Sequence, residues 1–503
     1  MQTNVLEYLE QTVPRVPQKI AFADETCQLT FQQVSENARA IGSALAKDGL
    51  YGEPVVVFME KSPAAINAFF GVLYGGCYYV PLDVEMPAFR IEMILEQLKP
   101  RAVICDATTQ PLLSQFGYAG KSYLFDEVIQ TPCNDAALAQ IRSKQLDIDP
   151  IYIVFTSGST GVPKGILACH RSVIDYIENL SETLGFAEDT VFGNQTPLYF
   201  DACLKELYPT LKFGATTYLV PKQYFSFPIK LVEYLNANKI NTICWVVSAL
   251  TMISATGTFK TVKPETLRTI AFGSEVFPVK QFRLWKEVLP NASFTNLYGP
   301  TEATGMSCYY HVNREFAETD AIPIGRPFRN TGIILLDENN KEVPFGEAGE
   351  ICIRGTCLTM GYYGQPEKTA EVFTQNPLQT RFPELIYRTG DIAHYNAEGD
   401  LVFVSRKDYQ IKHMGHRIEL GEIEINCGLY DGVEAVGCIY DKEKGKIVLF
   451  YTGKVEKAEL AAYLKQRLPR YMQPNLIRSL DEMPHTPNGK LDRKALKAIY
   501  DNA

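Results

Sequence analysis

The sequence lacks the residue patterns that mark metal sites, disulfide frameworks and nucleic-acid surfaces. Its 503 residues contain six histidines and twelve cysteines, with no C-x-x-C pair and no clustering of the two residue types. This spacing argues against a zinc site and against a disulfide framework, and favours reduced thiols. Lys plus Arg number 49 against 58 Asp plus Glu, a net charge of −9, so we expect no general attraction to nucleic acid or anionic membranes.

Long apolar runs are also missing. The most apolar region, residues 64–82, is interrupted by Asn67, by the pair Gly75-Gly76 and by Pro81, so it is typical of a buried helix followed by a strand. The first seven residues have neither a basic start nor an apolar centre, which excludes a signal peptide. We therefore expect no membrane insertion and a cytoplasmic location.

What the sequence does contain is an alternation of short apolar runs with helical patterns. Strands are predicted at residues 54–59, 78–83, 102–105, 151–155, 216–220, 242–247 and 269–272. Thr30 and Gln33 form a capping-box pattern at the start of an amphipathic helix. Repeated strand–helix units indicate a layered α/β architecture, and a chain of this length should form more than one domain.

Two changes in the sequence pattern along the chain predict the domain boundaries. From about residue 331 the strands are shorter and separated by polar turns, which predicts a β-rich subdomain at about 331–407 within a large N-terminal domain, 1–407. Residues 433–440 and 447–451 are typical of a hairpin, and the helix after it should end at Pro469. We therefore predict a small α+β C-terminal domain, 408–503.

Residues 156–165 (TSGSTGVPKG) form the most informative segment. Three glycines, four hydroxyl side chains and a lysine follow a predicted buried strand. Glycine-rich backbone can aim successive N–H groups at one anion, and hydroxyls and lysine add donors and charge, so a phosphate is the expected ligand. The spacing is not that of a Walker A loop. The alternative is an ordinary flexible surface loop.

Several short motifs resemble those of one family when they are taken together and in order. They are residues 75–83 (GGCYYVPLD), 156–165, 296–302 (NLYGPTE), 349–351 (GEI), 387–391 (YRTGD), 417–424 (RIELGEIE) and 488–493 (NGKLDR). The family is that of the acyl-adenylate-forming enzymes, in particular the amino-acid adenylation domains of nonribosomal peptide synthetases and the D-alanine:carrier-protein ligases. The resemblance covers nearly the whole chain.

The resemblance implies an ATP site with bound Mg²⁺. Tyr298 would stack on adenine and Asn296 would bind its edge, beside Gly299, while Thr301 and Glu302 would act at the α-phosphate, with Glu302 as the metal ligand. The β- and γ-phosphates would be held by Thr156, Ser157, Gly158, Ser159, Thr160, Gly161 and Lys164, and the ribose by Asp391, with Arg406 nearby.

The resemblance also implies that Lys490 is the catalytic cation that bridges the substrate carboxylate and the α-phosphate. Asp408 corresponds to the hinge about which the small domain rotates between two steps. Ser405 stands where glycine is usual, and residues 413–415 are less basic than in other members of the family.

Asp201, in the segment 200–203 (FDAC), matches the carboxylate that pairs with the α-ammonium group of an amino acid. The resemblance implies pocket walls at Ala202, Lys205, Cys244, Ile270, Phe272, Leu297, Gly305 and Met306. If Lys205 points inward, its ammonium needs an anionic or strongly polar partner, which suggests an acidic substrate such as glutamate or aspartate. If it pairs with Glu206 or a nearby surface acid, the pocket suits alanine or serine.

The expected function is therefore ATP-dependent activation of an amino acid and its transfer to the phosphopantetheine thiol of a separate carrier protein. We expect a free-standing enzyme, because no condensation domain precedes residue 1 and only thirteen residues follow Lys490. Asp201 argues against the alternative of an acyl-CoA synthetase that uses coenzyme A. The presence of Lys490 and Glu302 argues against a non-catalytic ligand sensor.

Overall fold

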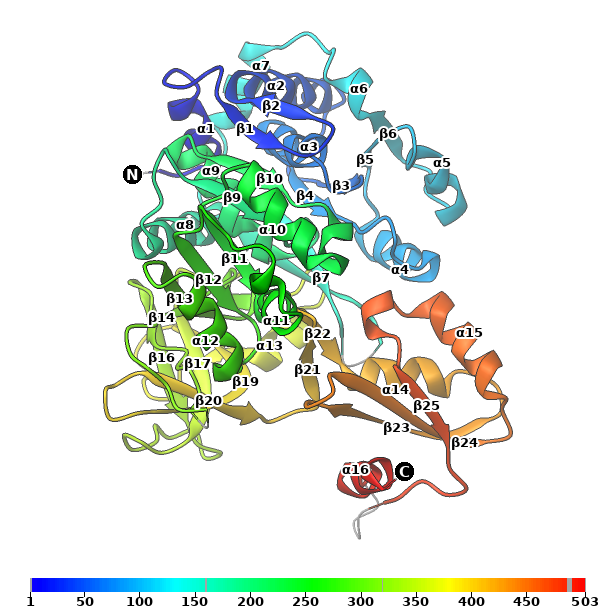
Figure 1. Cartoon of the computed structure of the whole chain (residues 1–503). Helices are drawn as coiled ribbons and strands as arrows, with labels where there is room; N and C mark the ends of the chain where they lie inside the picture. The colour runs from blue at the N-terminus through cyan, green and yellow to red at the C-terminus, as the bar shows by residue number, and fades with distance from the viewer. Residues whose placement is uncertain (1, 159–160, 319, 486–490, 503) are drawn as a thin grey trace.

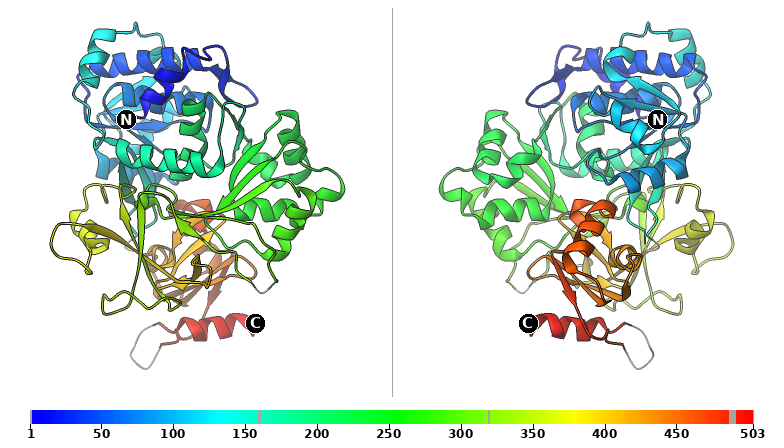
Figure 2. Two further views of the ribbon diagram at one scale, coloured as in Figure 1. Left: turned by 90° about the vertical axis from the view of Figure 1, so that its left-hand side faces the viewer. Right: turned by 90° about the vertical axis from the view of Figure 1, so that its right-hand side faces the viewer.

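The computed structural model describes residues 2–158, 161–318, 320–485 and 491–502. Within these ranges the strands form five sheets (Figure 1). Two large sheets with their helices and one smaller sheet make up the N-terminal domain. A two-stranded and a three-stranded sheet with three helices make up the described part of the small C-terminal domain, drawn in orange and red, with its red end lowest (Figure 2).

The first large sheet is parallel except for its last strand, β8, which runs antiparallel to β7. Its apolar strands are buried on both faces, as expected for a parallel sheet. Its four predicted strands are confirmed. The strand order is β6 (Lys121–Leu124), β5 (Ala102–Cys105), β3 (Pro54–Phe58), β4 (Tyr78–Pro81), β7 (Pro150–Thr156) and β8 (Lys164–Cys169).

The second large sheet has nine strands and confirms the remaining three predicted strands of the α/β region. Its central strands β10, β9, β11, β12 and β13 are parallel. The strand order is β15 (Arg326–Pro327), β14 (Cys308–His311), β13 (Ser293–Tyr298), β12 (Thr269–Gly273), β11 (Thr242–Val246), β9 (Val191–Asn194), β10 (Thr216–Leu219), β1 (Ile20–Ala23) and β2 (Gln28–Thr30).

Helices cover the two large sheets and join them through one core. The largest core cluster contains side chains of both sheets and of α2, α3, α8 and α9, so these helices lie between the sheets. The helices of this domain are α1 (Leu6–Thr12), α2 (Phe31–Lys47), α3 (Pro63–Tyr74), α4 (Ala88–Leu98), α5 (Gln110–Leu113), α6 (Phe125–Val128), α7 (Asp135–Arg142), α8 (His170–Leu184), α9 (Leu204–Phe213), α10 (Pro228–Ala237), α11 (Val247–Ala255), α12 (Val279–Val288) and α13 (Pro366–Val372).

Local sequence signals set the start of α2 and its packing. Thr30 and Gln33 make both hydrogen bonds of the capping box, as predicted. The helix then packs against α3 where Gly71 allows a close approach. A Cβ atom at position 71 would lie 2.5 Å from the Cβ atom of Ile41, so the contact between these helices requires glycine.

The β-rich sheet is antiparallel and falls within the predicted segment. Its strands are β16 (Thr331–Leu336), β17 (Gly349–Gly355), β19 (Leu385–Tyr395), β18 (Phe373–Gln375) and β20 (Leu401–Arg406). β20 leads directly into the small domain, so this sheet connects the two domains.

The small domain has two distinct faces. Alternate side chains of β24 pack against α14 and α15 on one face and against α16 on the other. The predicted hairpin and the helix that ends before Pro469 are confirmed. The elements are β21 (Gln410–His413), β22 (His416–Glu419), α14 (Leu420–Gly428), β23 (Val433–Asp441), β24 (Lys446–Gly453), α15 (Lys457–Arg467), β25 (Leu476–Ser479) and α16 (Arg493–Asp501).

We predict that Gly71→Ala lowers the free energy of unfolding of the large domain by about 1–3 kcal/mol, because the added methyl group overpacks the contact with Ile41. Thermal and urea unfolding would measure the change. The matched control is Gly428→Ala in α14, where an added Cβ meets only Val436 Cγ2 at 3.9 Å; this substitution should cause no loss. Equal stability of the two variants would contradict the prediction.

Candidate active site

A cavity of about 880 Å³ lies where the small domain meets both large sheets. It opens beside the carboxyl ends of the parallel strands, the usual position of ligand sites in α/β folds. Two short 3₁₀ turns, Asp201–Cys203 and Thr301–Ala303, bring site residues to it. The predicted site residues that line the cavity are Thr156, Ser157, Asp201, Ala202, Gly299, Thr301, Gly305, Met306, Asp391 and Arg406.

The predicted phosphate loop contacts the small domain directly. Ser157 Oγ donates a hydrogen bond to the carbonyl oxygen of Arg417 (2.8 Å), and the backbone N–H of Gly158 donates to Glu422 Oε2 (3.0 Å). Thr156 Oγ1 is buried and has no hydrogen-bond partner. The loop therefore holds one oxyanion, a carboxylate, and retains a donor near the cavity.

Lys164 flanks the loop on the side opposite Thr156, and its predicted contact with phosphate stays a prediction. It is the first residue of β8 and is paired in register with Thr156 at the end of β7. Its ammonium lies over the ring of Tyr362, 5.1 Å from the centroid, and burial lowers its pKa. Gly161 has a positive φ of 77°. Ser159 and Thr160 lie outside the described residues, as does Lys490.

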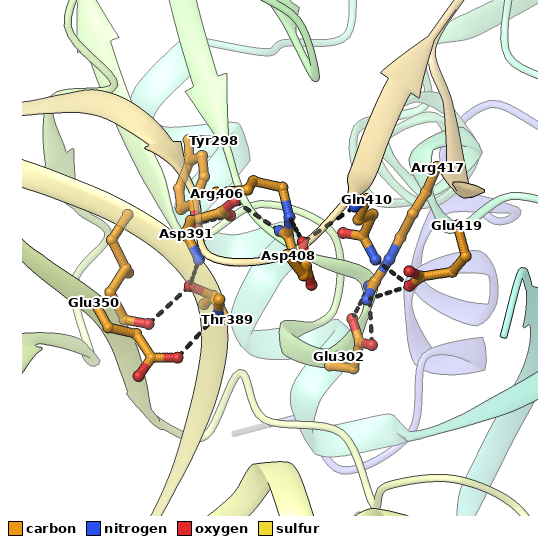
Figure 3. A network of polar contacts seen from close by, with 12 residues as sticks. Tyr298, Glu302, Glu350, Thr389, Asp391, Arg406, Asp408, Gln410, Arg417 and Glu419 are labelled. Carbon is orange, nitrogen blue, oxygen red and sulfur yellow. Dashed lines mark hydrogen bonds and ion pairs between the residues drawn. The ribbon is translucent and has the colours of Figure 1, made fainter. Parts of the chain in front are cut away.

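Glu302 is held in its ionised form by neighbouring cations. It is fully buried, and both of its oxygens accept hydrogen bonds from Arg417 Nη1, at 2.9 and 2.7 Å (Figure 3). Tyr362 Oη also donates to it (2.9 Å). Although burial acts to raise its pKa, the charges of Arg417 and Lys164 bring the pKa of Glu302 down to about 2.

A second network surrounds Asp391 (Figure 3). Tyr298 Oη donates to Asp391 Oδ2 (2.5 Å), and Arg406 Nη1 donates to Asp391 Oδ1 (2.7 Å). The same guanidinium donates twice to Asp408, at 2.7 and 2.8 Å. The structure thus links the predicted ribose-binding carboxylate to the predicted hinge residue through one arginine.

Asn296 and Tyr298, the predicted adenine contacts, do not line the cavity. Asn296 is buried, and its Nδ2 donates to the carbonyl oxygen of Pro323 (2.8 Å). Tyr298 is buried in the cluster that joins β13 to the β-rich sheet. Their neighbour Gly299 does line the cavity.

The predicted substrate-pocket walls divide between two faces of the nine-stranded sheet. Cys244 and Leu297 lie in the core cluster between the two large sheets. Ile270 and Phe272 lie in the cluster of the opposite face, which α11 and α12 cover. Side chains alternate along a strand, and Ala271 is the β12 residue on the same face as Cys244. The prediction that Ile270 and Phe272 line the pocket is therefore wrong.

Asp201 and Lys205 are both buried, the lysine with 4% of its surface exposed. Lys205 thus points into the protein rather than to solvent, although it does not line the cavity, and Glu206 beside it is also buried rather than at the surface. Burial raises the pKa of Asp201 to about 6, an effect that the Lys205 ammonium and the Thr301 hydroxyl only partly oppose. A buried carboxylate that lines the cavity is suited to bind a cation.

Several site residues were not singled out from the sequence. Arg417 and Glu422 belong to the 417–424 motif, which signalled a function but no role for either residue. Arg90 of α4 forms a buried ion pair with Glu422, and Lys412 of β21 lines the cavity, 5.9 Å from the ring centroid of Tyr298. Nothing in the local sequence around Arg90 or Lys412 distinguishes them, because their partners are distant in the chain.

The described part of the chain contains no group of three or more His, Cys, Asp or Glu side chains placed to hold a metal ion. It also contains no helix that is long and apolar enough to cross a bilayer. All twelve cysteines are free thiols.

Comparisons with known proteins agree with this geometry. The model of the AMP-binding enzyme family matches residues 9–363. Over 98% of its length the chain is 32% identical to tyrocidine synthase 1 of Brevibacillus parabrevis, but it spans only 45% of that protein. Over 99% of its length it is 30% identical to zwittermicin A synthase ZmaJ of Bacillus cereus, and it covers 95% of that protein. The adenylation domain AlmE of Vibrio cholerae, solved with glycyl-adenosine-5′-phosphate, has the same fold, with a TM-score of 0.85, 21% identity and coverage of 100% of this chain and 98% of AlmE.

The layered α/β domain, its β-rich subdomain and the small C-terminal domain are together the fold of the adenylate-forming enzymes. The chain belongs to the AMP-binding enzyme family and is an AMP-forming adenylating ligase of the type found in nonribosomal peptide synthetases.

We predict that Arg90→Met moves the small domain away from α4. The substitution leaves Glu422 buried without its cation, a loss of about 3–5 kcal/mol that opening of the interface would relieve. A larger radius of gyration in small-angle X-ray scattering and faster proteolysis near Asp408 would show the change. The control Arg101→Met removes a surface arginine that lies 3.5 Å from Glu53, and it should change neither the radius of gyration nor the rate of proteolysis. If the two variants behaved alike, this account of the interface would be refuted.

Proposed function

We propose that this enzyme converts an amino acid to its aminoacyl adenylate with release of pyrophosphate, and then transfers the aminoacyl group to the phosphopantetheine thiol of a separate carrier protein. The observation that carries the proposal is the buried Asp201 carboxylate in the same cavity as Thr301 and Asp391. An α-ammonium group fits Asp201, and this pairing would hold the substrate carboxylate beside the α-phosphate.

The nucleotide would occupy the side of the cavity formed by the phosphate loop, Thr301 and Asp391. Glu302 is fully ionised at neutral pH, and a buried carboxylate with phosphate oxygens is a suitable ligand set for Mg²⁺. When bound, Mg²⁺ screens the negative charge of the phosphates. Arg417 occupies both oxygens of Glu302 in this orientation of the small domain, so the guanidinium must withdraw before Glu302 can serve a metal ion.

The two faces of the small domain support two uses of it. The face with α14 carries Arg417 and Glu422 to the phosphate loop, whereas α16 packs on the opposite face, at the end of the molecule farthest from the blue N-terminal part (Figures 1 and 2). Lys490 precedes α16 in the sequence. We propose that rotation about Asp408 presents Lys490 for adenylation, and that the orientation described here serves transfer to the thiol.

Amino-acid-dependent exchange of pyrophosphate into ATP, measured across L- and D-amino acids, tests the proposal. At least one amino acid should support exchange, and failure of all of them would overturn the function. A separate assay, started from the adenylate, tests the acceptor. A holo carrier protein should accept the aminoacyl group. Transfer to coenzyme A alone would show that the enzyme is an acyl-CoA synthetase.

We predict that Lys490→Ala lowers the exchange rate at least about 100-fold, because one cation that stabilises transition-state charge is lost, while ATP binding stays largely intact. Exchange kinetics and equilibrium binding of ATP would measure the two effects. Lys494→Ala removes an exposed lysine four residues further on and is the matched control. Unchanged exchange in the Lys490 variant would refute its assigned role.

The pKa of Asp201, about 6, predicts a pH dependence of amino-acid use. Below this pH the carboxyl group is protonated and cannot pair with an α-ammonium, so kcat/KM for the amino acid should fall about tenfold per pH unit. Glu302, with a pKa of about 2, stays ionised throughout. Exchange kinetics between pH 5 and 8 would measure the profile, and a constant kcat/KM across this range would contradict the role of Asp201.

A further inference from the structure

The cavity has a polar end beside Asp201, and apart from this carboxylate its residues have no part in the proposed adenylation chemistry. Lys61, Gln195, Thr196 and Asp201 line this end. Behind them lies a layer of buried polar side chains, which consists of Asn194 from the end of β9 and of Lys205 and Glu206 from the first turn of α9, each at most 4% exposed. We name these seven residues the polar cluster.

The charges of the polar cluster balance without a substrate. Lys61 and Lys205 are two basic side chains, and Asp201 and Glu206 are two acidic ones. Burial lowers the pKa of Lys61 to about 7 and raises the pKa of Glu206 to about 7, so the total charge of the four groups is zero whether this pair is ionised or neutral. The Lys205 charge acts on both carboxylates, and the Lys61 charge acts on Glu206. A zwitterionic amino acid with a neutral side chain preserves this balance. A substrate with a side-chain carboxylate adds a buried negative charge, which is costly without a further cation.

The hydrogen bonds of the polar cluster, by contrast, are incomplete on both the donor and the acceptor side. Asn194 Nδ2 donates to Glu206 Oε2 (3.2 Å), and this bond fixes the amide so that Asn194 Oδ1 is an acceptor. Asn194 Oδ1, Glu206 Oε1 and Thr196 Oγ1 are buried without a partner. In the described part of the chain, the Lys205 ammonium makes no hydrogen bond or ion pair, although Lys61 Nζ donates to the carbonyl oxygens of Asn194 and Gln195.

Resting on the proposed function, we propose that the activated amino acid has a neutral side chain that both donates and accepts hydrogen bonds, namely a hydroxyl or a carboxamide. Such a group can accept from Lys205 and donate to the free oxygens of the cluster. An alkyl side chain can neither accept from Lys205 nor donate to these oxygens. A carboxylate has no hydrogen to donate and would face the acidic side chain of Glu206. Buried polar groups left without partners are costly, so the cluster selects for this chemistry.

The test compares amino acids of nearly equal shape in the exchange assay. The pairs are threonine with valine, serine with alanine, asparagine with aspartate, and glutamine with glutamate, each as L- and D-isomers. We expect the best substrate to be the hydroxyl or carboxamide member of its pair, with kcat/KM at least about 100-fold above that of its partner. A best substrate with an alkyl or carboxylate side chain would overturn the inference and leave the proposed function intact; exchange with no amino acid would overturn both.

Variants of the polar cluster give a second readout. Glu206→Gln keeps the shape of the side chain but removes one negative charge, so the ratio of kcat/KM for the acidic member over the neutral member should rise at least about tenfold. The control is Lys212→Met. Lys212 lies in the last turn of the same helix and forms an ion pair with Glu178, outside the polar cluster, so its loss should leave the ratio unchanged. Unfolding temperatures would confirm that both variants fold. An unchanged ratio in folded Glu206→Gln would overturn the role of the cluster.

Discussion

The buried ion pair between Glu302 and Arg417 couples the orientation of the small domain to the charge of the site. Glu302 is fully buried, and an isolated buried carboxylate is strongly unfavourable, so the large domain needs a cation at this position. Arg417 supplies it here, with one nitrogen, Nη1, donating to both carboxylate oxygens at 2.9 and 2.7 Å. Because the cation comes from the other domain, the charge state of the site and the position of the domain are coupled. Any cation that replaces Arg417 at Glu302 weakens the interface.

A second buried ion pair, between Arg90 and Glu422, holds the same interface at α4. Next to Arg90 in the sequence, the Phe89 ring lies under the guanidinium of Arg467, whose Cζ is 4.2 Å from the ring centroid. The carboxylate of Glu422 also accepts the N–H of Gly158 in the phosphate loop. The small domain therefore presents a guanidinium to the carboxylate of the large domain and a carboxylate to its anion-binding loop. The two contacts have opposite polarity, which fixes the orientation of the domain as well as its position.

Much of the fold could be predicted from the sequence because its signals are local. The capping box of Thr30, the buried strands and the hairpin of the small domain all follow from patterns within a few residues. The interface could not be predicted in this way, because Glu302 and Arg417 are 115 residues apart and Arg90 and Glu422 are 332 apart. The error at Ile270 and Phe272 has another cause: a one-residue change of register exchanges the two faces of a strand, and the pattern of a strand buried on both faces does not distinguish them.

The phosphate loop illustrates why one set of donors can serve two steps. The N–H of Gly158 binds a carboxylate in this orientation, and in the proposed first step the same N–H would bind a phosphate oxygen. Both ligands are oxyanions, and backbone donors do not distinguish them by shape. Under the proposed function, a nucleotide phosphate and Glu422 would therefore compete for the loop, just as Mg²⁺ and Arg417 would compete for Glu302. In the proposed reaction both competitions would favour the same outcome: a bound nucleotide would displace the α14 face of the small domain, and loss of pyrophosphate would allow that face to return.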